Sequence, residues 1–176
     1  MGTALHSEGS YGSTDHIDFR TAKECVGTTR SHLSHAVCDS KLEAGIVAKL
    51  ESDKRVAFYA KNDRLFCEIP YRWQGIASRY RPDYLIRLTD GRTLVLEGKG
   101  RRTERDDSKH QAARRWRDAV NDWGKMGRWE FDIARSVADV TAILTKLNVQ
   151  QRHPERILIL AVGAKPDIYD DAAARR

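Results

Sequence analysis

Apolar residues recur with the period of an α-helix in three segments of the chain. Residues 39–51 open with an Asp-Ser pair that can cap a helix, and apolar residues then follow at helical spacing. These residues are Leu42, Ile46, Val47 and Leu50. Residues 104–124 begin with acidic side chains, which suit the positive end of a helix, and close with a glycine. Their apolar face consists of Ala112, Trp116, Ala119, Val120 and Trp123. The pattern predicts amphipathic helices in both segments and a further helix at residues 136–147.

Runs of β-branched and aromatic residues predict strands between and after these helices. The predicted strands are residues 55–60, 65–69, 83–88, 92–99, 129–133 and 157–162. A short polar segment separates the first two strands, and we expect them to pair with each other. The last strand is so continuously apolar that both of its faces should be buried.

The order of these elements predicts an α/β fold in which helices flank both faces of a mixed β-sheet. Residues 1–14 are rich in Gly and Ser and short of large apolar groups, so we expect a flexible N-terminal arm there. The chain of 176 residues has the size of one ordinary domain. We expect residues 15–176 to form that single domain.

The hairpin predicted at residues 83–99 has two candidate registers, which send different side chains to the same face. A two-residue turn would set Tyr84 opposite Glu97 and would mix apolar groups with charges. A three-residue loop that ends at Gly91 in the left-handed conformation sets Asp83 opposite Glu97 instead.

The three-residue loop separates the two faces of the hairpin. One face is then entirely apolar or aromatic and consists of Tyr84, Ile86, Leu88, Leu94 and Leu96. The other face brings Asp83, Glu97 and Lys99 together, with Leu85 and Val95 beneath them. Hydrophobic patterning therefore favours the register that assembles a charged cluster.

This cluster has the composition of a metal-dependent site. Asp83 and Glu97 would lie about one cross-strand spacing apart, where two ionised carboxylates repel each other. Keeping both ionised is favourable mainly when a hard divalent cation binds between them, and Mg²⁺ is the natural candidate. Lys99 could orient an attacking water or stabilise charge on a phosphate. The alternative interpretation is a hairpin whose outer face carries solvated charges.

The overall charge and the cysteines indicate which partners and which cellular environment to expect. The chain has 31 Lys and Arg against 25 Asp and Glu, and its isoelectric point of about 9.3 is typical of proteins that meet polyanions. The three cysteines form no CxxC pair, so neither a disulfide framework nor a zinc site is indicated. No stretch approaches the ~20 apolar residues that span a bilayer. We therefore expect a soluble, cytoplasmic protein that does not enter a membrane.

The sequence Pro82-Asp83, followed by Glu97-x-Lys99, resembles the PD-(D/E)XK nuclease signature, which is short and degenerate by itself. Further blocks in the same order resemble the C-terminal endonuclease domain of type III restriction enzymes. They are residues 17–23, 29–35, 39–43, 66–71 and 109–129. The resemblance covers about residues 15–163. It implies a PD-(D/E)XK core and a Mg²⁺-dependent DNA endonuclease of a restriction system, which hydrolyses phosphodiester bonds with a metal-activated water.

Carried over by position, the resemblance also implies individual roles. Asp83 and Glu97 would ligate Mg²⁺, the Gly98 carbonyl would add a ligand, and Lys99 would be catalytic. Mn²⁺ could substitute for Mg²⁺. Glu43 would be a fourth catalytic residue, and the alternative is a solvent-facing helix glutamate. The chain departs from the family pattern in the residue before Glu43 and in Gly98, and both departures bear on catalytic rate rather than on fold.

Basic residues follow the predicted site in the sequence, and we expect them to contact DNA phosphates. They are Arg101, Arg102, Lys109, Arg114 and Arg117. A solvated basic surface would explain the same residues equally well.

The expected partner is double-stranded DNA. Type III restriction subunits, by resemblance, join this nuclease to an ATP-driven helicase motor, yet the chain has no GxxxxGK[ST] phosphate loop. A helicase/ATPase motor and a DNA methyltransferase subunit are therefore candidate partners in trans. The competing hypothesis is a noncatalytic DNA-binding or assembly remnant of such a subunit.

Overall fold

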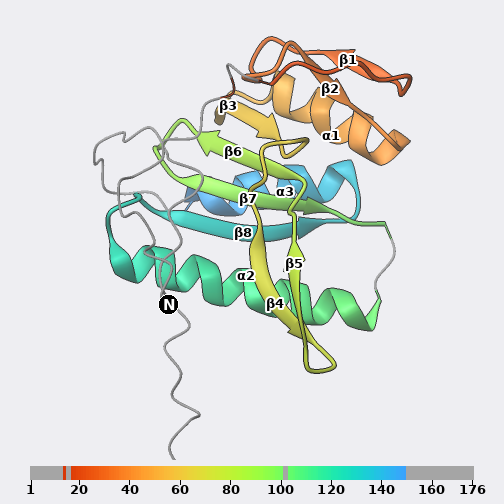
Figure 1. The fold of residues 1–176 in the computed structure, drawn as a ribbon. Coiled ribbons are helices and arrows are strands. Elements are labelled where there is room, and N and C mark those ends of the chain that lie inside the picture. The colour runs from red at the N-terminus through yellow and green to blue at the C-terminus, as the bar shows by residue number, and fades with distance from the viewer. Residues whose placement is uncertain (1–13, 15–16, 101–102, 150–176) are drawn as a thin grey trace, which may run out of the picture.

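A four-stranded mixed sheet forms the centre of the computed structural model (Figure 1). The structure describes residues 14, 17–100 and 103–149. Outside these residues lie Arg101, Arg102, residues 1–13 of the predicted arm and the strand predicted at residues 157–162. The central strands are β3 (Val56–Lys61), β6 (Tyr84–Leu88), β7 (Thr93–Gly98) and β8 (Trp129–Ala134).

The sheet has the order β3-β6-β7-β8. Strand β6 is antiparallel to both of its neighbours, β3 and β7, whereas β8 runs parallel to β7. Parallel neighbours need a long crossover connection, and the helix α2 (Glu104–Trp123) provides it.

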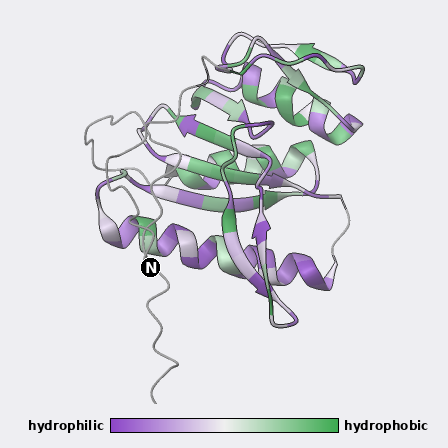
Figure 2. Ribbon diagram, in the orientation of Figure 1, coloured by the Kyte–Doolittle hydropathy of each residue, from purple (hydrophilic) through white to green (hydrophobic). Residues whose placement is uncertain are grey.

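Helices cover both faces of this sheet, as the sequence predicts. On one face, α1 (Lys41–Ser52) and α3 (Val137–Val149) pack over the apolar side of the β6–β7 hairpin. On the other face, α2 packs over Val95 and Phe131 through Ala112, Ala113 and Val120. Figure 2 shows largely hydrophobic central strands beside an α2 that carries many hydrophilic positions. The α/β fold class with a mixed sheet between helices is therefore confirmed.

The helix ends follow the capping signals in the sequence. The Ser40 side chain accepts a hydrogen bond from the Glu43 backbone at the start of α1. Thr103 and Asp106 form a reciprocal capping box at the start of α2. One prediction for α2 is wrong: the sequence pattern assigns Trp123 to the buried apolar face of the helix, yet it is 40% exposed. It stands in the last turn of the helix, where the Lys125 ammonium lies 5.6 Å from its ring centre.

The predicted register of the β6–β7 hairpin is confirmed. Tyr84 lies opposite Leu96, and Ile86 lies opposite Leu94. Gly91 has a φ of 87°, which is the left-handed conformation that the three-residue loop requires. Asp83 immediately precedes Tyr84, and Glu97 immediately follows its partner Leu96, so the two acids lie at the same end of the hairpin.

The strand predicted at residues 65–69 is wrong, and so is its pairing with residues 55–60. Strand β3 pairs with β6 instead. Arg64 and Phe66 have positive φ values of 62° and 56°, which no strand accommodates. The Asn62 side chain also binds both the backbone amide and the carbonyl of Cys67, so it occupies groups that a neighbouring strand would need.

Two small antiparallel sheets complete the described part of the fold. Strand β1 (Cys25–Gly27) pairs with β2 (His35–Val37), and β4 (Ile69–Trp73) pairs with β5 (Ile76–Tyr80). The sequence analysis missed the second hairpin, which turns at Gln74 and Gly75 with both residues at positive φ. The β4–β5 hairpin packs against α2 and leads directly into the segment that carries Asp83. Among the described residues, no helix is long and apolar enough to cross a membrane.

Candidate active site

Two carboxylates meet at the open end of the β6–β7 hairpin. Asp83 immediately precedes β6 and is half-buried, whereas Glu97 lies within β7 and is only 5% exposed. The Gly98 amide donates a 2.7 Å hydrogen bond to Asp83 Oδ2. The Tyr80 hydroxyl donates a 2.8 Å hydrogen bond to Glu97 Oε2. The second oxygen of each carboxylate receives no hydrogen bond from the described residues.

The pKa values of both carboxyl groups are raised. Burial raises the pKa of Asp83, and the negative charge of Glu43 raises it further. Burial and the charge of Asp83 raise the pKa of Glu97 to about 7. Two desolvated acids that repel each other are costly to ionise together, and a cation bound to both would remove that cost.

Lys99 extends the strand that carries Glu97. Its backbone amide donates to the Ala134 carbonyl and so continues the pairing of β7 with β8. Its ammonium lies 3.1 Å from Asp106 Oδ1. The positive charge of Lys99 lowers the pKa values of both Asp83 and Glu97, which places the ammonium within electrostatic reach of the pair.

Asp106 anchors this lysine to the start of α2. Its side chain is 1% exposed and also lies 3.4 Å from the Lys109 ammonium. Its Oδ2 accepts hydrogen bonds from the Thr103 amide and hydroxyl at 2.8 and 2.7 Å. Burial alone would raise the pKa of Asp106, but the bonds from Thr103 and Lys99 hold it below its usual range. Asp106 is therefore a fixed negative charge that orients Lys99.

Glu43 reaches the site from the first turn of α1. Its Oε2 lies 2.9 Å from the ammonium of Lys61, which stands at the end of β3. The Lys61 ammonium also donates to the Val37 carbonyl at 2.5 Å and lies 3.4 Å from Asp63. Glu43 is therefore paired inside the fold rather than free in solvent, with its side chain 20% exposed.

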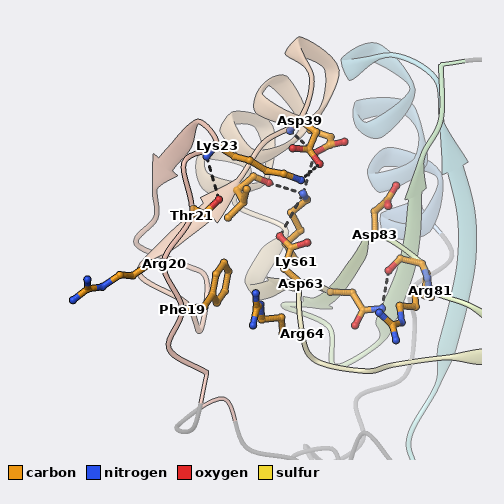
Figure 3. A pocket seen from close by; sticks show the side chains of 14 residues that line it. Phe19, Arg20, Thr21, Lys23, Asp39, Lys61, Asp63, Arg64, Arg81 and Asp83 are labelled. Carbon is orange, nitrogen blue, oxygen red and sulfur yellow. Dashed lines mark hydrogen bonds and ion pairs between the residues drawn. The ribbon is translucent and has the colours of Figure 1, made fainter.

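A pocket of about 390 Å³ joins Glu43 and Lys61 to Asp83 (Figure 3). Basic side chains from separate segments line it as well, including Arg64 and Arg81. Figure 3 shows Lys61 and Asp83 on different walls of this space. The pocket leads from the protein surface to one member of the carboxylate pair.

The oxygen atoms of this site suit a hard cation that keeps some of its own water ligands. Among the described residues, no three His, Cys, Asp or Glu side chains form a metal-binding group. Asp83, Glu97 and the Gly98 carbonyl supply oxygen ligands only, and Mg²⁺ is commonly held by one or two carboxylates together with water and substrate phosphate. The two carboxylates with raised pKa values therefore fit Mg²⁺, and the same donors suit Mn²⁺.

Gly98 is compatible with an intact strand. It pairs with Ala134 in the β7–β8 register. A Cβ atom at this position would lie 2.8 Å from Ile46 Cδ1 in the fully buried core and 3.5 Å from Asp83 Oδ2. Glycine therefore lets α1 approach the site closely while its amide holds Asp83.

The residues predicted to bind DNA differ in their surroundings. The Lys109 ammonium lies at the site, close to Asp106 and 5.8 Å from the Tyr80 ring centre. Arg114 is exposed and lies over the Phe131 ring. Arg117 pairs with its neighbour Asp118 at 2.6 Å. The other two predicted contacts, Arg101 and Arg102, lie outside the described residues.

Three residues of the site escaped the sequence analysis as functional candidates: Tyr80, Lys61 and Asp106. The spacing Thr103-x-x-Asp106 carries the signal of a capping box, which could have identified Asp106 as a fixed acid. Lys61 and Tyr80 carry no comparable signal, because the glutamates that they contact, Glu43 and Glu97, are distant from them in the chain.

Comparisons with protein-family models, curated proteins and solved structures found no match to this chain. The assignment of a function therefore depends on the geometry of these residues.

Proposed function

We propose that this chain is a Mg²⁺-dependent endonuclease that hydrolyses phosphodiester bonds in double-stranded DNA. The observation that carries the proposal is that Asp83 and Glu97 lie at the same end of the hairpin, where the charge of Asp83 acts on Glu97 and the Lys99 ammonium is in electrostatic reach of both. Such a combination of two acids and a lysine suits metal-assisted phosphate chemistry better than a solvated surface, because Glu97 is buried and its pKa is raised.

Each residue has a distinct task in this proposal. Asp83 and Glu97 would hold the metal ion, aided by the Gly98 carbonyl. A Mg²⁺ ion held there would lower the pKa of a bound water and polarise the phosphate. The Lys99 ammonium orients the attacking water and stabilises the negative charge that develops on the phosphate. Tyr80 and the Gly98 amide keep the two carboxylates in place through one hydrogen bond each.

The wider context is part of the same proposal. The sequence resemblance to type III restriction nucleases supports a PD-(D/E)XK core, a restriction system in the cytoplasm, and a motor and a methyltransferase as partners in trans. The positive net charge of six favours a polyanionic substrate. The second candidate is a noncatalytic DNA-binding or assembly remnant. It is favoured by one observation, that the described residues hold no group of three metal-binding side chains.

Cleavage of supercoiled plasmid with Mg²⁺ or Mn²⁺, against EDTA, tests the proposal. We expect metal-dependent nicking that falls by at least about a hundredfold in Asp83→Asn and in Lys99→Met. Asp122→Asn is the matched control, since it removes the same charge from an exposed position of α2. A wild type that cuts neither alone nor with motor and methylating subunits would favour the noncatalytic remnant.

A further inference from the structure

The Lys61 ammonium is buried between two acids beside the proposed metal site. Its side chain is 9% exposed, and its three N–H groups face three acceptors: Glu43, Asp63 and the Val37 carbonyl. Burial lowers the pKa of Lys61, but the two carboxylates raise it by more than burial lowers it. The net pKa is raised, so the group stays charged. A charged lysine in this position is a permanent cation within the pocket.

Glu43 is already engaged by this cation. Its Oε2 receives both the Lys61 ammonium at 2.9 Å and the Asp39 backbone amide at 3.0 Å. The same ammonium acts on the other acid of the pocket, because the charge of Lys61 lowers the pKa of Asp83. Glu43, Lys61 and Asp83 line the same pocket, so Lys61 supplies positive charge to two acids that could otherwise attract a second metal ion.

The formal charges of the connected cluster support a single metal ion. Its carboxylates are Glu43, Asp63, Asp83, Glu97 and Asp106, and its ammonium groups are Lys61, Lys99 and Lys109. Five negative and three positive charges leave a formal charge of minus two among these described residues, which one divalent cation balances. Without the Lys61 charge the same cluster would carry minus three.

We propose that the Lys61 ammonium occupies the place of a second divalent cation, so that the chain binds one metal ion, at Asp83 and Glu97. Glu43 then acts as a positioning residue that holds Lys61, and it is not a metal ligand. The inference rests on the proposed function, since it concerns the Mg²⁺ site of the nuclease.

The test counts Mn²⁺ ions bound per chain, by the electron paramagnetic resonance of free Mn²⁺ in the absence of DNA. We expect one ion for the wild type, two for Lys61→Met, and one again for the double variant Lys61→Met/Glu43→Gln. Lys49→Met is the matched control, because it removes a lysine that bridges the buried Asp53 at the opposite end of α1. It should bind one ion. A wild type that binds no ion or two ions, or a folded Lys61→Met that binds one, would overturn the inference.

A second variant keeps the test decisive if Lys61→Met does not fold. Glu43→Gln alone should still bind one Mn²⁺, because Glu43 is not a metal ligand in this proposal. Its affinity should stay within about threefold of the wild type, which is less than 1.4 kcal/mol of binding free energy. Loss of binding in this variant would overturn the inference. The proposed function fails separately: a chain that binds one Mn²⁺ but cuts no DNA would contradict the nuclease and leave the single-ion site intact.

Discussion

Asp53 and Glu97 are both buried carboxylates, 7% and 5% exposed, yet the protein surrounds them in opposite ways. Asp53 ends α1 and receives two side-chain hydrogen bonds from Arg55, at 2.8 and 2.7 Å, and the Lys49 ammonium at 3.1 Å. Hydrogen bonds from Arg55 hold the pKa of Asp53 well below its usual range. Glu97 receives one hydrogen bond, from Tyr80, and its pKa is raised to about 7.

The difference separates a structural acid from the acid that we propose to bind a metal ion. A buried charge is tolerated when a partner of opposite charge and good geometry compensates it, as Arg55 does for Asp53. Glu97 lies among groups that include a second acid, Asp83, and the nearby ammonium of Lys99 is engaged by Asp106. Burial is the main cause of the raised pKa of Glu97, and perturbed carboxyl pKa values of this kind are typical of functional sites.

The largest expected effect is a loss of activity without a loss of stability when Glu97 is replaced. Glu97→Gln should reduce metal-dependent plasmid cleavage by about a thousandfold, or ~4 kcal/mol, because a metal ligand is lost. The free energy of unfolding of the metal-free variant at pH 8 should equal or exceed that of the wild type, because an uncompensated buried charge is removed. Cleavage rates and urea unfolding measure the two quantities. Activity close to the wild type would remove Glu97 from the site.

The opposite outcome is expected at Asp53. Asp53→Asn should lower the free energy of unfolding at pH 7 by about 3 kcal/mol, because Arg55 loses its buried charged partner. Urea unfolding measures this loss. The rate of cleavage per folded molecule should stay within about twofold of the wild type, which is a change of far less than 1.4 kcal/mol in activation free energy. A variant as stable as the wild type would show that the two acids do not differ in the proposed way.

The pH dependence of stability is the smallest of the three effects. The pKa of Glu97 rises from its ordinary value of 4.5 to about 7 in the folded chain. A raised carboxyl pKa stabilises the fold most below pH 4.5, and this contribution is lost as the pH rises through 7. Between pH 5 and pH 8 the metal-free wild type should therefore lose about 2 kcal/mol more than Glu97→Gln. Mg²⁺ should reduce the loss, since it binds the ionised form. Equal pH profiles for the two proteins would contradict the raised pKa.

Asp53 contributes in the opposite direction and in another pH range. Its pKa is lowered from 3.8, so its contribution to stability is present above pH 4 and is lost as the pH falls further. The two acids can therefore be distinguished by measuring the free energy of unfolding against pH. Asp53→Asn should alter this profile below pH 4, and Glu97→Gln should alter it between pH 5 and pH 8.

The sequence by itself determined the features that depend on neighbours in the chain. The periodicity of Ile46, Val47 and Leu50 placed α1, and the separation of apolar from charged positions selected the hairpin register. That register brings Asp83 and Glu97 together, because a strand alternates its side chains between two faces and Gly91 fixes the loop.

Tertiary structure decided which charges compensate each other. Lys61 meets Glu43, Tyr80 meets Glu97, and Lys99 meets Asp106 only after β3, the β4–β5 hairpin and α2 pack around the central hairpin. The strand predicted at residues 65–69 failed for the same reason, since the Asn62 side chain and the pairing of β3 with β6 outweigh local β-propensity there. Local patterns fix which side chains share a face, whereas the compensation of a buried charge depends on partners that the fold brings from distant parts of the chain.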